Sequence, residues 1–210
     1  MHQVIEANNK YKSAHCGEDL DVRTLLDMFK KKFVPFATKV PGIFRKKSQE
    51  DIQRLGNLIV STYRYYLAPD MQARWTEKTF TLNINNCVLT AKIDVISDAG
   101  DVRDYKILSN RNLFNTIKDD LQLSIIAMMF RLHFGEEEKS LGWDVVCGGV
   151  HAVKIDTTRT QDDLKRTVER IEKVAYDMSN FQLEEHIHKR NCAKRYCLHY
   201  QSCKGIMKNG

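Results

Sequence analysis

Hydrophobic residues recur at helical spacing through the first third of the chain. Their intervals of three and four positions predict amphipathic helices over residues 2–11, 20–33 and 48–66. Ser48 and Asp51 mark the start of the third helix, because a serine followed three positions later by an acidic residue forms a capping box. The stretch 34–46 contains Pro35 and Pro41, which predicts a loop. We therefore expect the chain to begin with a group of helices.

The hydrophobic period shortens to two residues near position 80. Phe80, Leu82 and Ile84 alternate with polar residues, which predicts a strand with one face toward a core. The dipeptide Asn85-Asn86 then supplies turn chemistry. The same alternation predicts further strands over residues 88–96 and 102–108. These segments form an antiparallel meander.

The second half of the chain alternates between helix and strand. The predicted elements are a helix at 116–133, strand character at 144–155 and a helix at 160–180. Gly148 and Gly149 interrupt the strand stretch, and Thr160 with Asp163 forms a second capping box. The order of elements predicts an α/β fold, in which helices flank a mixed central β-sheet that contains the antiparallel meander.

The composition is that of a soluble globular protein. Hydrophobic residues make up 42% and charged residues 29% of the 210 positions. The longest apolar run, residues 125–130, is far too short to cross a bilayer. No charged-then-apolar leader opens the sequence, so we expect a cytoplasmic protein without a membrane partner.

The net charge of +6 is concentrated at the C-terminus. Residues 186–210 contain six basic side chains and no acidic one, whereas all 27 acidic residues lie earlier in the chain. A basic tail suits a polyanionic partner such as DNA. On charge alone, a solvated terminus without a partner explains the pattern equally well.

Two acidic residues and a lysine are expected to share one face of the meander. A symmetric turn centred on Ala99 places Asp94 opposite Asp104 on the next strand. Because alternate side chains of a strand share a face, Lys106 joins Asp104, while Tyr105 points to the other face. The sequence therefore predicts that two carboxylates and one ammonium group converge.

Carboxylates that face each other across a hairpin repel, so this pair destabilises the fold unless something neutralises it. Mg²⁺ or Mn²⁺ can do so, because hard cations take carboxylate oxygens and keep several waters. Water on such an ion is easier to deprotonate and can attack phosphorus, and a nearby lysine offsets the developing charge. The alternative is that these are ordinary charged side chains on the wet face of an exposed hairpin.

These residues resemble the core motif of PD-(D/E)XK nucleases of the RecB type. In that family a strand ending in Gly-x-hydrophobic-Asp precedes a strand carrying Asp-Tyr-Lys. Residues 89–94 and the tripeptide Asp104-Tyr105-Lys106 match this pattern. His2 resembles the histidine of the family's His-x-x-hydrophobic-Glu segment, and Gln122 resembles the start of its Gln-x-x-x-Tyr motif.

The resemblance implies a restriction-endonuclease-like core that hydrolyses DNA with Mg²⁺ or Mn²⁺. The metal ligands it implies are His2, Asp94, Asp104 and the main-chain carbonyl of Tyr105. Lys106 is then the residue that positions the attacking water, and Gln122 supports the site or the DNA. The chain departs from the family pattern at Ala91, where glycine is preferred, and at Ile126, where the motif has tyrosine.

Three cysteines near the C-terminus resemble the iron–sulfur branch of this family, which includes the AddB helicase-nuclease subunit and the CRISPR-associated exonucleases. They are Cys192, Cys197 and Cys203. In that branch such a trio and one upstream cysteine hold a 4Fe–4S cluster. The family's upstream cysteine precedes the helix that carries the histidine, and this sequence begins at Met1. We therefore expect that region to be missing, and Cys16 is the nearest candidate for a fourth ligand.

Zinc is an equally good occupant of the tail on residue chemistry alone. His188 and His199 lie among the cysteines, and together these side chains offer enough ligands for a tetrahedral site. Only the resemblance favours iron over zinc.

We expect two parts, a nuclease core over residues 1–185 and a basic, cysteine-rich tail over residues 186–210. The expected activity is that of a Mg²⁺- or Mn²⁺-dependent deoxyribonuclease. It is expected to act as an exonuclease on DNA ends or single strands, in recombination, repair or phage DNA metabolism, with a helicase or recombination protein as a further partner. Two alternatives stay open. One is a non-catalytic DNA-binding module with the same fold, and the other is a regulatory protein with a zinc-binding tail.

Overall fold

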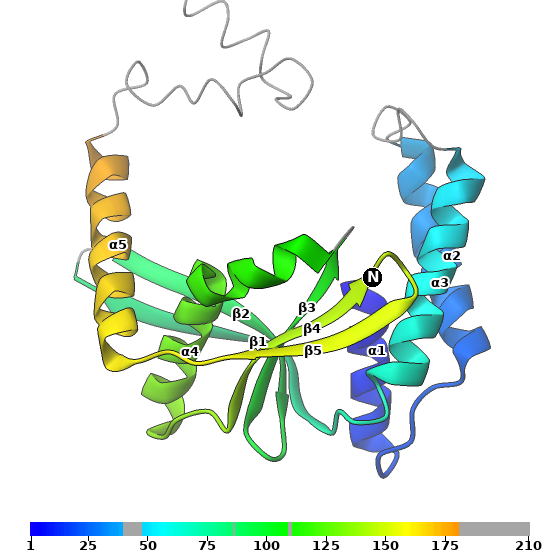
Figure 1. The fold of residues 1–210 in the computed structure, drawn as a ribbon, viewed down its shortest axis with the longest axis horizontal. Coiled ribbons are helices and arrows are strands. Elements are labelled where there is room, and N and C mark those ends of the chain that lie inside the picture. The colour runs from blue at the N-terminus through cyan, green and yellow to red at the C-terminus, as the bar shows by residue number, and fades with distance from the viewer. Residues whose placement is uncertain (40–47, 86, 109–110, 181–210) are drawn as a thin grey trace, which may run out of the picture. The chain divides into compact units, whose positions relative to one another are not determined.

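A computed structural model describes residues 1–39, 48–85, 87–108 and 111–180. Within these ranges, one sheet of five strands has the order β1-β2-β3-β4-β5 (Figure 1). The strands are β1 (Ala73–Ile84), β2 (Cys87–Ser97), β3 (Asp101–Leu108), β4 (Ser140–Cys147) and β5 (His151–Thr157). Neighbouring strands are antiparallel except β3 and β4, which are parallel. The predicted α/β fold with a mixed sheet and an antiparallel meander is confirmed.

The parallel pair β3–β4 is joined by a helical crossover, as parallel strands require. The crossover contains the 3₁₀ helix η2 (Arg111–Asp119) and the α-helix α4 (Leu121–Phe134). A single helix over 116–133 was predicted, and that prediction is wrong at its start. Asp120 adopts an extended conformation, and its carboxylate accepts a hydrogen bond from the N–H of Leu123. This N-cap begins a new helix, which places Gln122 in the first turn of α4.

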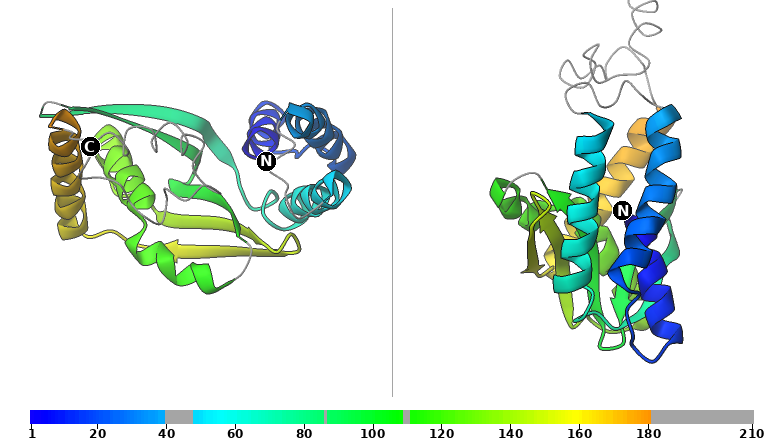
Figure 2. Two further views of the ribbon diagram at one scale, coloured as in Figure 1. Left: turned by 90° about the horizontal axis from the view of Figure 1, so that it is seen from above. Right: turned by 90° about the vertical axis from the view of Figure 1, so that its right-hand side faces the viewer.

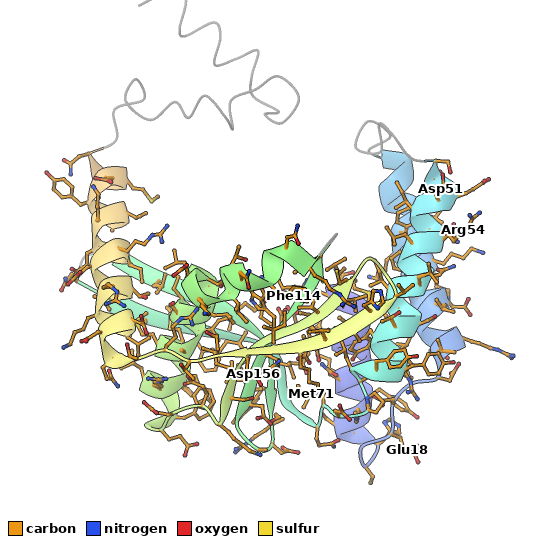
Figure 3. The ribbon with its side chains drawn as sticks, in the orientation of Figure 1. Glu18, Asp51, Arg54, Met71, Phe114 and Asp156 are labelled. Carbon is orange, nitrogen blue, oxygen red and sulfur yellow. The ribbon has the colours of Figure 1, made fainter. Side chains whose placement is uncertain are left out.

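Three helices precede the sheet, namely α1 (His2–Ala14), α2 (Val22–Lys39) and α3 (Gln49–Tyr66). The capping box of α3 is confirmed, because Ser48 Oγ accepts a hydrogen bond from the N–H of Asp51 at 3.0 Å. Figure 3 labels Asp51 near the start of this helix. The predicted loop at 34–46 is wrong as far as Lys39, since α2 continues through Pro35. Proline removes one helical hydrogen bond, but the rest of this 18-residue helix tolerates the loss.

Two sets of side chains pack on the sheet. The first joins α1, α2 and α3 to the strands and includes Tyr63 of α3, Val95 of β2 and Tyr105 of β3. Tyr63 and Tyr105 meet edge to face, with ring centroids 5.8 Å apart. In the second set, the ring of Phe134 in α4 packs on the ring of Trp75 in β1, with ring centroids 5.0 Å apart. Figure 2 shows α4 apart from the three N-terminal helices, so the two sets cover different parts of the sheet.

The last described element is α5 (Gln161–Ser179), which begins at the predicted capping box of Thr160 and Asp163. The chain divides into two compact units, residues 1–170 and 171–210, and α5 crosses this boundary. The boundary predicted between residues 185 and 186 lies outside the described residues. In the described parts of the chain, no helix combines the length and the apolar character needed to span a bilayer.

Candidate active site

The site begins where β2 and β3 separate. Their ladder contains the pairs Val95–Arg103 and Ile96–Val102, which is the register predicted from the symmetric turn. Asp94 and Asp104 are the next residues along the two strands, beyond the last pair. Because β3 continues beside β4 while β2 diverges, the side chain of Asp94 can enter the space between the strands.

Asp94 is fixed by the main chain of β3. Its Oδ2 accepts a hydrogen bond from the N–H of Tyr105 at 2.9 Å. The Tyr105 ring is anchored in the core against Tyr63, so the backbone donor is held in place. The Asp94 side chain is only 9% exposed, which makes its position depend on these contacts more than on solvent.

Asp104, Lys106 and Gln122 form a closed set of polar contacts. Lys106 Nζ lies 2.6 Å from Asp104 Oδ2. Lys106 Nζ also donates to Gln122 Oε1 at 2.7 Å, and Gln122 Nε2 donates to Asp104 Oδ1 at 2.7 Å. β3 supplies the acid and the lysine, and α4 supplies the amide that joins them. Trp143 of β4 lies beside Asp104 in the ladder, and both residues are buried.

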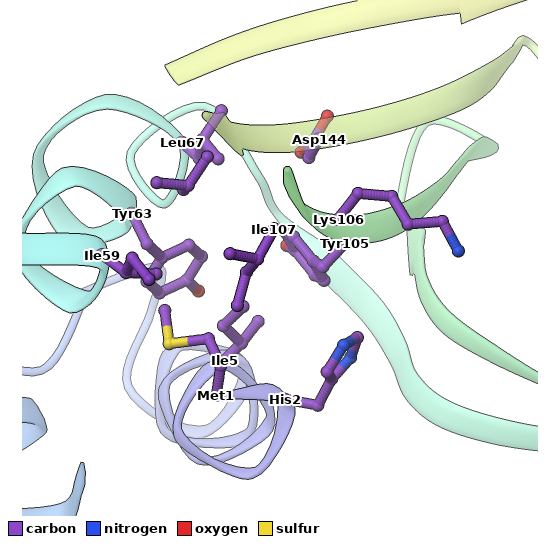
Figure 4. Close-up of a pocket in the computed structure, with 11 residues that line it drawn as sticks. Met1, His2, Ile5, Ile59, Tyr63, Leu67, Tyr105, Lys106, Ile107 and Asp144 are labelled. Carbon is purple, nitrogen blue, oxygen red and sulfur yellow. The ribbon is translucent and has the colours of Figure 1, made fainter. Parts of the chain in front are cut away.

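His2 reaches the site from the N-terminus of α1. Its Nδ1 lies 3.3 Å from Asp94 Oδ2, and its side chain is half-exposed. Figure 4 shows that Met1 and Ile5 are among the residues that line a small cavity, and that the His2 ring and the Lys106 side chain project from it toward the same side. The cavity volume is about 10 Å³, which is room for a single water. The hydrogen bond to Asp94 raises the pKa of His2.

The two carboxylates have opposite electrostatic surroundings. Burial raises the pKa of Asp104 to about 6; the charge of Asp94 acts in the same direction, and Lys106 opposes both. Burial also acts to raise the pKa of Asp94, but the hydrogen bonds from His2 and from the Tyr105 N–H outweigh it and lower that pKa. Asp94 is therefore ionised at neutral pH, while Asp104 carries its charge against a penalty that a nearby cation would relieve.

Glu77 is an acidic residue near the site that sequence reasoning missed. A carboxylate oxygen of Glu77, a ring nitrogen of His2 and a carboxylate oxygen of Asp94 all lie within 4.8 Å of one another. The first strand was predicted to begin at residue 80, so Glu77 was left outside it. The signal was present, because pairing outward from the Asn85-Asn86 turn places Glu77 opposite Asp94.

The cysteines of the predicted cluster are not brought to this site by the described structure. Cys192, Cys197 and Cys203 lie outside the described residues, as do His188 and His199. Cys16 is a free, exposed cysteine just beyond the end of α1. Among the residues that the structure describes, Cys16 belongs to no group of three metal-ligating side chains.

Fold and site together define a nuclease-type α/β domain. The family described as the PD-(D/E)XK nuclease superfamily matches residues 1–204, and the chain belongs to this superfamily. Its members use divalent metals. One similar solved structure is a "Putative exonuclease" from Eubacterium rectale, with a TM-score of 0.49 and 13% identity over 78% of this chain and 69% of that chain. No curated protein sequence matches the chain.

Proposed function

We propose that the protein is a Mg²⁺- or Mn²⁺-dependent DNA exonuclease that hydrolyses phosphodiester bonds at DNA ends or in single strands. The proposal is supported by the charged groups near the point where β2 and β3 separate: Lys106 contacts Asp104, and both interact electrostatically with Asp94. Membership of the PD-(D/E)XK superfamily supports the nuclease class. The choice of DNA and of exonuclease action rests on the resemblance to RecB-type enzymes.

The donor set fits a hard divalent cation. Asp94 and Asp104 would hold the ion, with His2 and the main-chain carbonyl of Tyr105 as further ligands. Carboxylate and carbonyl oxygens with one imidazole suit Mg²⁺ or Mn²⁺ better than soft metals. When bound, the ion supplies positive charge for the phosphate and acidity for a water molecule. Burial, followed by the charge of Asp94, raises the pKa of Asp104 to about 6, and a bound cation would oppose both effects.

Lys106 and Gln122 would then lie on the side of the two acids that faces the substrate. Gln122 Oε1 and Asp104 both contact the ammonium group, so Lys106 Nζ is held in one place. From there it donates a hydrogen bond to the attacking water or to a phosphate oxygen, and it offsets negative charge that develops in the transition state. Gln122 keeps the acid and the lysine in register, which makes it a positioning residue.

The test is cleavage of end-labelled single-stranded DNA in Mn²⁺ by matched lysine variants. Lys106→Ala should lose activity by about 100-fold or more while still binding DNA. Lys154→Ala removes an exposed lysine on β5 that pairs with Asp70, and it should cleave like the wild type. Equal, residual cleavage by the wild type and Lys106→Ala would instead favour a non-catalytic DNA-binding module.

We also propose that the tail binds a 4Fe–4S cluster through Cys192, Cys197 and Cys203, with Cys16 as the candidate fourth ligand. The cysteine pattern of the sequence supports this, together with the resemblance to the iron–sulfur branch. A helicase or recombination protein is the proposed partner on the same ground. Anaerobic purification followed by metal analysis tests the cluster. Brown protein containing iron and sulfide is expected, and colourless protein containing zinc overturns the assignment in favour of the zinc-binding tail.

A further inference from the structure

Glu77 lies directly opposite Asp94 in the ladder between β1 and β2. The pairs on either side are Thr76–Val95 and Lys78–Ile93, so the two acids face each other on neighbouring strands. Carboxylates in this relationship repel and weaken a sheet. The Glu77 side chain is only 12% exposed, so water does little to screen the repulsion. Such a pair calls for a cation between the strands.

We propose that Glu77 is a further ligand of the divalent cation, binding it together with His2 and Asp94. This inference rests on the proposed nuclease function and adds a residue to its metal site. It adds a ligand from β1 to those proposed from α1, β2 and β3.

The spacing of the ligand atoms permits one ion to touch all three side chains. Oxygen ligands lie about 2.0–2.6 Å from Mg²⁺ or Ca²⁺, so two ligands on opposite sides of one ion are about 4–5 Å apart. Atoms of His2, Glu77 and Asp94 all lie within 4.8 Å of one another. Three different elements supply them, namely α1, β1 and β2.

Lys92 is the cation that contacts Glu77 in this structure. Its ammonium group forms an ion pair with Glu77, and no other partner of Glu77 is recorded in the described structure. The Lys92 side chain is 58% exposed, so it can move into solvent without burying a charge. A divalent ion that binds Glu77 must displace Lys92. The lysine is then a competitor of the metal, and its removal should strengthen metal binding.

The simpler interpretation is that Glu77 serves only as the ion-pair partner of Lys92. The two interpretations differ in whether the effect of Lys92 on the metal depends on Glu77. If Glu77 serves only Lys92, removing the lysine charge still favours a cation at Asp94, because the two groups interact electrostatically, and that gain is the same with or without Glu77. If Glu77 is a ligand, replacing the lysine frees Glu77 for the metal, and most of the gain in affinity is lost when Glu77 is replaced as well.

The experiment is titration of Mn²⁺ into the full 210-residue chain at neutral pH, with free Mn²⁺ followed by electron paramagnetic resonance. The Mn²⁺ binding assigned to this site is the binding that Asp94→Asn abolishes. Glu77→Gln should weaken it about tenfold or more. Glu18→Gln is the charge-matched control, because Glu18 is exposed and belongs to no ligand group among the described residues. It should change the affinity by less than about twofold.

Replacement of the competitor completes the test. Lys92→Met should tighten Mn²⁺ binding, a change that misfolding cannot produce, and most of this gain should be lost when Glu77→Gln is added. The proposal is overturned if Glu77→Gln binds like Glu18→Gln while Asp94→Asn loses the site, or if Lys92→Met tightens binding as much in the Glu77→Gln background as in the wild type; the nuclease proposal then stands. If Asp94→Asn leaves Mn²⁺ binding unchanged, the proposed metal site is wrong and the role of Glu77 falls with it.

Discussion

The carboxylate of Asp94 accepts a hydrogen bond from the main-chain N–H of Tyr105, across the point where β2 and β3 part. The contact is possible because the ladder between these strands stops after Val95–Arg103, whereas β3 stays paired with β4 along its whole length. An acidic side chain thus occupies the place that a neighbouring strand would otherwise fill. The topology of the sheet, more than any local sequence preference, fixes the first acid of the site.

Asp104→Asn should stabilise the metal-free protein at neutral pH. Burial raises the pKa of Asp104 to about 6 from 3.8, so the folded state holds a proton that the unfolded state releases. Below the unfolded value both states are protonated and no penalty exists. As the pH rises from 3.8 to about 6, folding stability falls, and the full penalty is present above the folded value. Asparagine does not titrate, so the Asp104→Asn variant does not carry this penalty.

Urea unfolding in EDTA across this pH range measures the effect. The variant should exceed the wild type by an amount on the order of 1–2 kcal/mol at pH 7, and the difference should vanish below about pH 4. Asp98→Asn, at an exposed turn position, provides the control and should match the wild type throughout. A wild type that is at least as stable as Asp104→Asn at pH 7 contradicts the electrostatic account of the site.

Gln122→Ala should reduce DNA cleavage without unfolding the protein. The amide joins Asp104 to Lys106, and its loss frees the lysine to adopt other rotamers. We expect kcat to fall by about tenfold or more, with KM for DNA little changed, because the residue positions catalytic groups and does not bind substrate. Gln49→Ala, at an exposed position of α3, is the matched control. A change in KM alone would instead indicate that Gln122 contacts the DNA.

Arg103 should be the most sensitive charged residue for stability. Its guanidinium donates to Asp144 Oδ1 at 2.8 Å and to the Trp143 carbonyl at 2.9 Å, and it also pairs with Asp156 of β5, labelled in Figure 3. The Arg103 side chain is 4% exposed and that of Asp144 is fully buried. Arg103→Met leaves a buried carboxylate without its partner, which should lower the free energy of unfolding by about 3–5 kcal/mol.

A double variant distinguishes a lost pair from a lost fold. Adding Asp144→Leu to Arg103→Met removes the stranded charge and should recover most of the stability, because well-packed hydrophobic residues can replace a buried ion pair. Asp156→Ala should lower the free energy of unfolding by less than about 1 kcal/mol, since its side chain is 69% exposed. If the double variant is no more stable than Arg103→Met, the ion pair is not the source of the effect.

Local sequence patterns predicted those parts of the fold that depend on neighbouring residues. The register around the turn at residues 97–101 follows from turn geometry, and the predicted pairing holds for Val95–Arg103. The caps at Ser48 and Thr160 follow from hydrogen bonds three residues apart. Asp94, Asp104 and Lys106 could be named because one hairpin carries all three.

Features that depend on distant contacts could not be predicted in the same way. Glu77 has a left-handed backbone, with φ of 54°, and stands in a stretch without clear alternation, so the start of β1 was missed. The bridge that Gln122 makes depends on a crossover helix whose start is set by Asp120. The approach of His2 to Asp94 depends on how α1 packs against the sheet. The last two contacts have no local signature in the sequence, and for Glu77 the one signal is the register that runs outward from the Asn85-Asn86 turn.

The most direct test of the account is a crystal structure of the protein soaked with Mn²⁺, with the metal located by its anomalous scattering. We predict a peak within about 2.0–2.6 Å of carboxylate oxygens from both Asp94 and Asp104. A structure in which manganese binds elsewhere, while Lys106 and Gln122 still hold Asp104 as in the metal-free state, would contradict the central claim.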